Sequence, residues 1–144
     1  MLITIDTNVI YQALRNQGAS YYILKLIRYF KINLALSVPV FQEYEDVLNR
    51  QKTLHDIGLD KSDIANFLSF LAFVGKTHTP YFLFRPNLRD ENDNIFIELA
   101  FCSNSQYLIT SNIRDYQVNN NLKFNSFEII TPSDFLHKWK QEYE

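Results

Sequence analysis

Short runs of apolar residues mark the strands of this chain. Residues 2–5 (LITI) form a mainly β-branched run that is too short for a helix and that ends in the turn-forming sequence Asp-Thr-Asn. Similar apolar runs follow at residues 34–38, 107–112 and 127–131. We expect each run to be a strand, and we expect Thr7 or Asn8 to cap a helix directly after the first one.

Apolar residues spaced three and four apart mark the helices between these runs. We expect Ser20 to cap the first of them, and Pro39 to begin the second, because proline loses nothing at a helix start. Asp60 or Ser62 would begin the third helix and Gly75 would end it. The segments with this spacing are 20–30, 39–50, 60–75, 89–106 and 132–143.

Strands that alternate with helices imply parallel pairing with right-handed crossovers. The pattern therefore predicts an α/β fold, an open sheet with helices on both faces, in a single domain spanning residues 1–144. Residues 77–86, with two prolines, fit either a short edge strand or an extended loop. In sheets of this kind, ligands gather at the carboxyl ends of the strands.

The aromatic residues of segment 20–30 recur at helical spacing. We therefore expect them to lie mostly in the core. Some of them would alternatively form an exposed patch for a partner protein. These residues are Tyr21, Tyr22, Tyr29 and Phe30.

Composition and charge narrow the class of protein. A hydrophobic fraction of 47% with only 3 Gly and 4 Pro is typical of a globular chain and argues against disorder. The net charge of −2 gives no overall attraction to nucleic acid, so such binding would depend on local cations or metal ions. Cys102 is the single cysteine, which excludes an internal disulfide. Because no secretory leader or membrane-length apolar run is evident, we expect a cytoplasmic protein with no membrane association.

Four separate segments bring carboxylates toward one edge of the predicted sheet. Asp6 follows the first strand, and Glu43 lies one turn into the helix after the second. Asp90 and Asp93 lie at the start of the helix before the next strand, and Asp115 lies just beyond that strand. Clustered carboxylates repel one another unless cations share the site, and all-oxygen ligands favour Mg²⁺ or Mn²⁺. Such ions suit phosphodiester hydrolysis, because they acidify a water and stabilise a phosphoryl oxygen.

Three stretches carry a family resemblance through their order and spacing: IDTNVI, SVPVFQEYEDVL, and DENDNIFIELA followed by YLITSNIRDY. With these stretches the chain resembles the PIN-domain ribonucleases, in particular the VapC-like toxin components of bacterial toxin–antitoxin systems. The resemblance implies a three-layer α/β/α PIN-like domain with a central parallel sheet. It further implies a Mg²⁺- or Mn²⁺-dependent endoribonuclease that cleaves RNA, forms a homodimer and is held inactive by an antitoxin.

The resemblance also assigns residues. Four acids match the metal-binding and catalytic positions of the family: Asp6, Glu43, Asp93 and Asp115. Five neighbours would surround and orient them: Thr7, Asn8, Asp90, Thr110 and Asn112. The position of Asn112 often holds aspartate in relatives. Here it offers only a neutral oxygen, so we expect weaker metal binding at that position.

Simpler interpretations of the same residues stay open. Asp6 alone would serve as a helix cap, Glu43 as a solvated surface charge and Asp115 as a turn residue. Asp90 and Asp93 would complement the dipole of the helix that they begin. The alternative functions are a nuclease for RNA processing or single-stranded DNA and a non-catalytic PIN-like binding module, which the neutral side chain at position 112 favours.

Overall fold

The computed structural model describes residues 1–80, 94–116 and 126–144. Its five strands form one parallel sheet in the order β3-β2-β1-β4-β5, which confirms the predicted fold class. The central strand β1 pairs through Ile3 with Leu34 on one side and with Tyr107 on the other. The strands are β1 (Leu2–Ile5), β2 (Asn33–Leu36), β3 (Lys76–Thr77), β4 (Tyr107–Ile109) and β5 (Glu128–Ile130).

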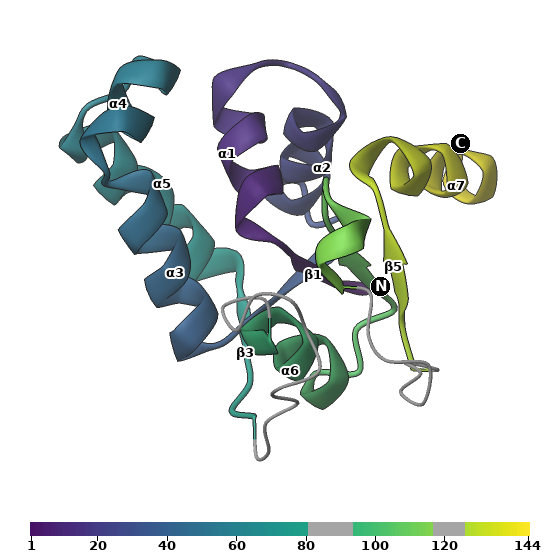
Figure 1. Ribbon diagram of the computed structural model, residues 1–144. Helices are drawn as coiled ribbons and strands as arrows, with labels where there is room; N and C mark the ends of the chain where they lie inside the picture. Colours follow the sequence, from purple (N-terminus) through teal and green to yellow (C-terminus); the bar gives the residue numbers. More distant parts are fainter. Residues whose placement is uncertain (81–93, 117–125) are drawn as a thin grey trace.

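Helices cover both faces of this sheet. The α-helices of the described part are α1 (Thr7–Arg15), α2 (Ala19–Arg28), α3 (Val38–Leu48), α4 (Gln51–Ile57), α5 (Lys61–Val74), α6 (Asn94–Cys102) and α7 (Pro132–Tyr143). Helices α1 and α2 lie on one side of the sheet and α6 on the other, with α7 packed beside α2 (Figure 1). In the described ranges, every helix is too short or too polar to cross a membrane.

Two predicted helix caps are wrong. We expected Thr7 or Asn8 to cap the first helix, but Asp6 occupies the N-cap position, as its simpler interpretation allowed. Its side chain makes no capping hydrogen bond, and it accepts a hydrogen bond from Thr110 across the sheet edge instead. We expected Ser20 to cap the next helix, but Gly18 occupies that position and leaves the Ser20 hydroxyl inside the first helical turn. As a result, the Asp6 carboxylate bonds to Thr110 rather than to its own helix, and the Ser20 hydroxyl does not cap α2.

The starts of α3 and α5 follow ordinary capping chemistry. Ser37 caps α3 by accepting the N–H of Val40 at 3.3 Å, so Pro39 is the second residue of the helix rather than the first. Asp60 begins α5 and forms a reciprocal capping box with Asp63, which selects one of the two predicted starts. The short helix α4 lies between them, in a segment where the sequence predicted no helix.

One edge of the sheet is formed by the two-residue strand β3. Strand β3 pairs with β2 at two residues, and only Thr77 lies in the segment for which an edge strand or an extended loop was predicted. Residues 81–86 of that segment lie outside the described residues.

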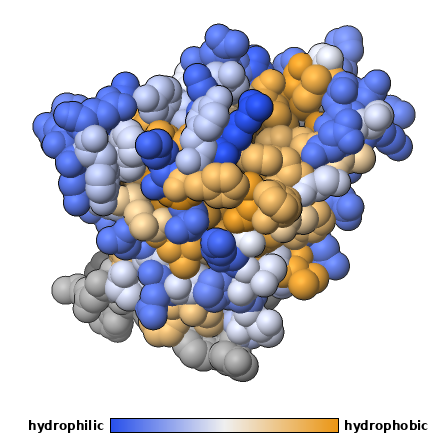
Figure 2. Space-filling model, turned by 180° about the vertical axis from the view of Figure 1, so that it is seen from behind, coloured by the Kyte–Doolittle hydropathy of each residue, from blue (hydrophilic) through white to orange (hydrophobic). Residues whose placement is uncertain are grey.

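The aromatic residues at the end of α2 correct the prediction of a core role. Tyr29 and Phe30 are 60% and 69% exposed, because α2 ends at Arg28 and the chain turns through a positive φ of 59° at Phe30. Tyr21 and Tyr22 are half-buried. Seen from behind, the molecule carries further apolar side chains gathered across one face (Figure 2).

Candidate active site

The site is built where the two central strands end. Strand β1 ends at Ile5 and β4 at Ile109, and these residues are paired in register. The N–H of Asp6 donates to the carbonyl of Ile109 at 2.9 Å, which continues the pairing one residue beyond the strand. The parallel register therefore brings Asp6 and the segment after β4 to the same edge, as the sequence pattern predicted.

A hydrogen-bond network surrounds the Asp6 carboxylate. The Thr110 hydroxyl donates to Asp6 Oδ2 at 2.7 Å, and the Asn8 amide donates to the same oxygen at 3.3 Å. Thr110 Oγ1 also accepts from the Asn8 amide at 3.4 Å and from the backbone N–H of Asn112 at 3.2 Å. The Asn8 amide oxygen accepts the N–H of Ser111 at 3.1 Å. Asp6 is thus held in one orientation by groups from two strand ends.

The carboxyl group of Asp6 is buried. Asp6 is only 5% exposed, and this burial raises the pKa of its carboxyl above the ordinary value of 3.8. The charge of Asp115 raises the pKa further, while the hydroxyls of Thr110 and Tyr116 and the N–H of Thr7 lower it. Among the described residues no Lys, Arg or His contributes to the pKa of Asp6. A cation at this position would therefore offset an uncompensated charge.

Tyr44 of α3 holds the end of β1 through a hydrogen bond to its last residue, Ile5. This tyrosine of α3 is fully buried against Phe96 of α6, and its hydroxyl donates to the carbonyl of Ile5. Burial and the nearby charge of Asp6 hold the pKa of Tyr44 well above 10, so the hydroxyl stays protonated. Glu43 is half-exposed and directly precedes Tyr44, so its backbone lies in the turn of α3 that packs against this strand end.

Replacing Tyr44 with phenylalanine should lower the free energy of unfolding by about 1–2 kcal/mol, because the Ile5 carbonyl loses its buried donor. Urea denaturation of the purified protein measures this change. Tyr107→Phe is the matched control, since within the described residues the Tyr107 hydroxyl forms no hydrogen bond. Equal stability losses in the two variants would contradict a special role for the Tyr44 hydroxyl.

The other predicted residues are only partly placed. Asp115 is half-buried in the 3₁₀ helix η2 (Ile113–Tyr116), and its N–H donates to the Asn112 carbonyl at 3.2 Å. The Asn112 side chain is exposed, so this residue joins the network through its backbone N–H. Asp90 and Asp93 lie outside the described residues. Of the four predicted acids, the structure thus describes Asp6, Glu43 and Asp115.

The donor chemistry around Asp6 fits a hard divalent cation. Within residues 1–80, 94–116 and 126–144, no group of three or more His, Cys, Asp or Glu side chains is placed to hold a metal ion. The groups of the described part that could ligate a metal here are oxygens, including the carboxylates of Asp6 and Asp115. Thr7 adds a buried hydroxyl that has no hydrogen-bond partner in the described part of the chain. Oxygen ligands of this kind suit Mg²⁺ or Mn²⁺ rather than a softer metal.

Sequence reasoning did not find Tyr44, Tyr116 or Gln12 as neighbours of the site. Periodicity marks Tyr44 only as a core position, and no local pattern shows that its hydroxyl meets the end of β1. Gln12 accepts the Ser111 hydroxyl at 3.1 Å across a large separation in sequence, which only the fold creates.

Comparison with known proteins adds a family and a fold. The family model described as "PIN domain" matches residues 3–114. No curated protein matches the sequence significantly. Among solved structures, the chain is similar to a chain in the crystal structure of VapBC2 from Rickettsia felis bound to a DNA fragment from their promoter. That match has a TM-score of 0.59 and 18% identity, and it covers 91% of this chain and 98% of that chain. At this identity the likeness shows a shared fold.

Proposed function

Because the chain belongs to the PIN domain family, we propose that it is a metal-dependent endoribonuclease that hydrolyses RNA phosphodiester bonds. We further propose that it is the toxin component of a toxin–antitoxin pair. One observation carries the first proposal: the buried carboxylate of Asp6 lies near Asp115 at the carboxyl edge of the sheet, with a raised pKa and no described cationic side chain to compensate it.

The proposed metal is one or two Mg²⁺ or Mn²⁺ ions. When bound, such an ion stabilises charge on the phosphoryl oxygens and lowers the pKa of the attacking water. The residues of the chain prepare the site for it: Thr110 and Asn8 fix the orientation of the Asp6 carboxylate, as outer partners of metal ligands do. The ligands in this proposal are Asp6, Glu43, Asp93 and Asp115.

The residues that would orient these acids are Thr7, Asn8, Asp90, Thr110 and Asn112.

A second candidate function, a non-catalytic PIN-like binding module, is favoured by one feature. Asn112 presents a neutral, exposed side chain at a position where relatives often carry aspartate, which reduces the negative charge available to a metal. A nuclease for RNA processing or for single-stranded DNA differs from the toxin in substrate rather than in chemistry.

Metal removal tests the proposed reaction. Purified protein should cleave a mixed-sequence single-stranded RNA with Mg²⁺ or Mn²⁺, and excess EDTA should abolish the cleavage, because the carboxylates alone supply no positive charge to the phosphate. A single-stranded DNA of the same sequence is the matched substrate control. Cleavage that persists in EDTA would contradict the metal dependence. A folded, partner-free protein that cleaves with neither metal would favour the binding module.

The antitoxin is the proposed protein partner. The chain shares its fold with a chain of VapBC2, a complex bound to promoter DNA. A cavity of 390 Å³ beside α3 is lined by Val38, Phe41 and Ala72 together with polar residues that include Glu45, and its apolar part offers a surface for apolar side chains of such a partner. A homodimer and a cytoplasmic location stay predictions. An adjoining gene for a small protein with a DNA-binding start and an apolar tail would support the toxin assignment.

A further inference from the structure

We propose that the seam between α2 and α7 binds the part of a single-stranded RNA that flanks the scissile phosphodiester. We use the name α2–α7 seam for two adjoining cavities of 260 and 460 Å³, which share Ala19 of α2 and Ser133 of α7. The inference rests on the proposed nuclease function, which it deepens by naming where the substrate strand continues beyond the acids.

The smaller cavity is connected to the candidate active site. Ser111 forms part of its wall, and the N–H of Ser111 donates at 3.1 Å to Asn8, which in turn donates to Asp6 at 3.3 Å. The Ser111 hydroxyl donates to Gln12 in the same wall. Six neutral polar residues line this cavity: Gln12, Asn16, Ser20, Ser111, Thr131 and Ser133. A strand whose phosphate lies at Asp6 would therefore meet uncharged hydrogen-bonding groups next.

Hydrogen-bond donors without a partner line the same cavity. Ser20 is only 5% exposed, and in the described part of the chain its hydroxyl makes no hydrogen bond. It belongs to the first turn of α2, where Gly18 provides no side-chain cap for the free N–H groups. Helix α7 also begins at this cavity, with Ser133 in its first turn. The start of α7 is capped by Thr131 and carries Asp134 in its first turn, so the uncapped start of α2 is the positive helix end here. Together with the buried Ser20 hydroxyl it favours an anion, and no acidic residue lines the cavity.

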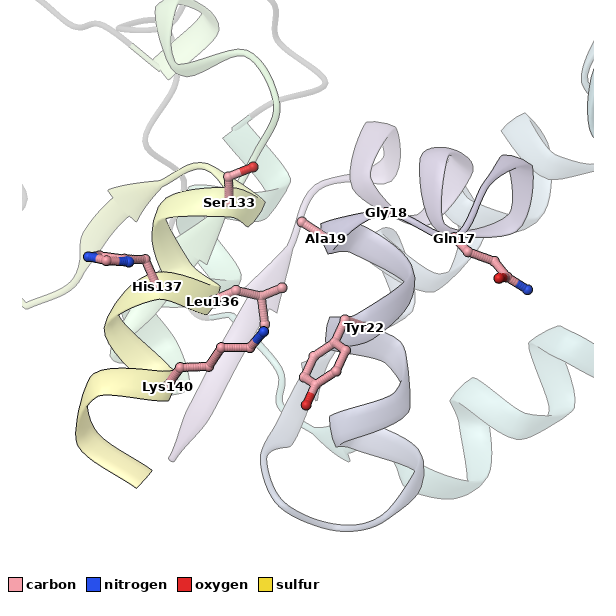
Figure 3. Close-up of a pocket in the computed structure, with 8 residues that line it drawn as sticks. All are labelled: Gln17, Gly18, Ala19, Tyr22, Ser133, Leu136, His137 and Lys140. Atoms are coloured by element: carbon pink, nitrogen blue, oxygen red, sulfur yellow. The ribbon is translucent and has the colours of Figure 1, made fainter. Parts of the chain in front are cut away.

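The larger cavity continues from there between the two helices. Figure 3 shows Leu136 and Lys140 of α7 facing Ala19 and Tyr22 of α2. The Lys140 ammonium lies 4.8 Å from the centroid of the Tyr22 ring. The Tyr22 hydroxyl donates to Glu144 at 3.2 Å, which holds the ring and places a carboxylate at the far end of the seam.

This arrangement fits a single nucleic-acid strand better than a protein segment. Sites for single strands combine a positively charged path for the backbone with aromatic rings on which bases stack. The seam offers a neutral form of the first and a compact form of the second: phosphate acceptors match the hydroxyl donors at Ser20 and Ser133, and Lys140 supplies one cation beside the aromatic face of Tyr22. The net charge of −2 supplies no general attraction, so binding must come from local groups such as these.

Equilibrium binding tests the seam without requiring cleavage. Fluorescence anisotropy in EDTA measures the Kd of the full-length protein for a labelled single-stranded RNA of about 12 nucleotides, a length typical of such sites. Ser133→Glu adds a charge at the second position of α7, where acids favour the helix. We expect it to weaken binding by about tenfold or more, through repulsion of the phosphate. The matched control, Ser62→Glu, adds the same charge at the second position of α5 and should change Kd by less than about twofold.

A second pair of variants tests the cation. Lys140→Gln should weaken binding about threefold to tenfold and should lower the slope of log Kd against log salt by about 0.7, the value for one phosphate contact in a single strand. Lys52→Gln, an exposed residue of α4, should change neither quantity. A lysine with only a structural role in the α2–α7 contact would leave the salt slope unchanged.

The outcomes separate this inference from the proposed reaction. Binding that is equal in all five proteins, or absent in the wild type, overturns the seam. If the wild type nonetheless cleaves RNA with metal, the nuclease proposal stands. If binding depends on the seam but the protein cleaves RNA with neither Mg²⁺ nor Mn²⁺, the seam is supported and the nuclease proposal is overturned.

Discussion

Asp6→Asn should abolish RNA cleavage, lowering kcat/KM by about 10³-fold or more, while the protein stays folded. Loss of a single electrostatic stabiliser of a transition state already costs about 10²–10³-fold. The amide is nearly the same shape as the carboxylate and can still accept the Thr110 hydroxyl, but it carries no charge for a metal. Single-turnover cleavage of labelled RNA measures the effect, and circular dichroism reports the fold.

The raised pKa of Asp6 also predicts the direction in which Asp6→Asn changes the stability of the metal-free protein. Burial raises the pKa of Asp6 above 3.8, so the folded state binds the proton more tightly than the unfolded state. The wild type therefore loses stability as pH rises from 3.8 through the folded pKa, whereas Asp6→Asn escapes this loss. At neutral pH without metal we expect the variant to melt at the same or a higher temperature than the wild type.

Metal addition should reverse that order. Mn²⁺ at a hundredfold excess over its Kd would stabilise the wild type by about 2.7 kcal/mol and leave Asp6→Asn unchanged. Asp46→Asn removes one carboxylate from the surface ion pair with Arg50, and this control should retain both cleavage and the metal response. Full activity of Asp6→Asn would remove Asp6 from the mechanism.

Thr110→Val should produce the second largest effect, a loss of about 10–100-fold in metal affinity or kcat/KM. Valine has the shape of threonine but cannot donate to Asp6 or accept the N–H of Asn112. The same change should lower the free energy of unfolding by about 1–3 kcal/mol, because a hydrogen bond to a charged group is lost in a fully buried position. Thr110→Ser should restore most of the activity, since it keeps the hydroxyl.

Thr4 provides the matched control. It is also a fully buried threonine, and its hydroxyl bonds to Ser105 Oγ at 2.9 Å and takes no part in the hydrogen bonds of Asp6 and Thr110. Thr4→Val should therefore lower stability without changing metal affinity. Isothermal titration with Mn²⁺ and denaturant unfolding separate the two properties. If both valine variants lose stability and neither loses metal affinity, Thr110 has no positioning role.

The sequence predicted the sheet well because each main strand is marked by a short apolar run in the local sequence. A short β-branched run such as residues 2–5 favours a buried strand because it is too short for a helix, and alternation with helices leaves parallel pairing as the simple solution. Capping was predicted less well. Asp60 forms its capping box within four residues, so the local sequence shows it. Asp6 makes no capping bond, because its carboxylate accepts a hydrogen bond from Thr110, which is distant in sequence.

The candidate site divides in the same way. Asp6 and Asp115 stand out in the sequence because each follows a strand, and Glu43 because it lies in the helix that follows the second strand. Asn8 bonds the carboxylate from two positions away, whereas the role of Thr110, and its contact with Asn8, depend on hydrogen bonds between residues about a hundred positions apart. No short-range pattern contains that information.

The sequence by itself determined the fold class, the order of the main strands and the edge of the sheet at which Asp6 lies, because hydrophobic periodicity and strand–helix alternation are local properties. Only the tertiary structure decided the burial of Asp6, its raised pKa, and the seam that joins Ser20 and Lys140 to the same edge. These properties depend on which side chains the register of β1 and β4 and the packing of α2 on α7 bring together. Desolvation and hydrogen bonding act through such contacts in space, irrespective of separation along the chain.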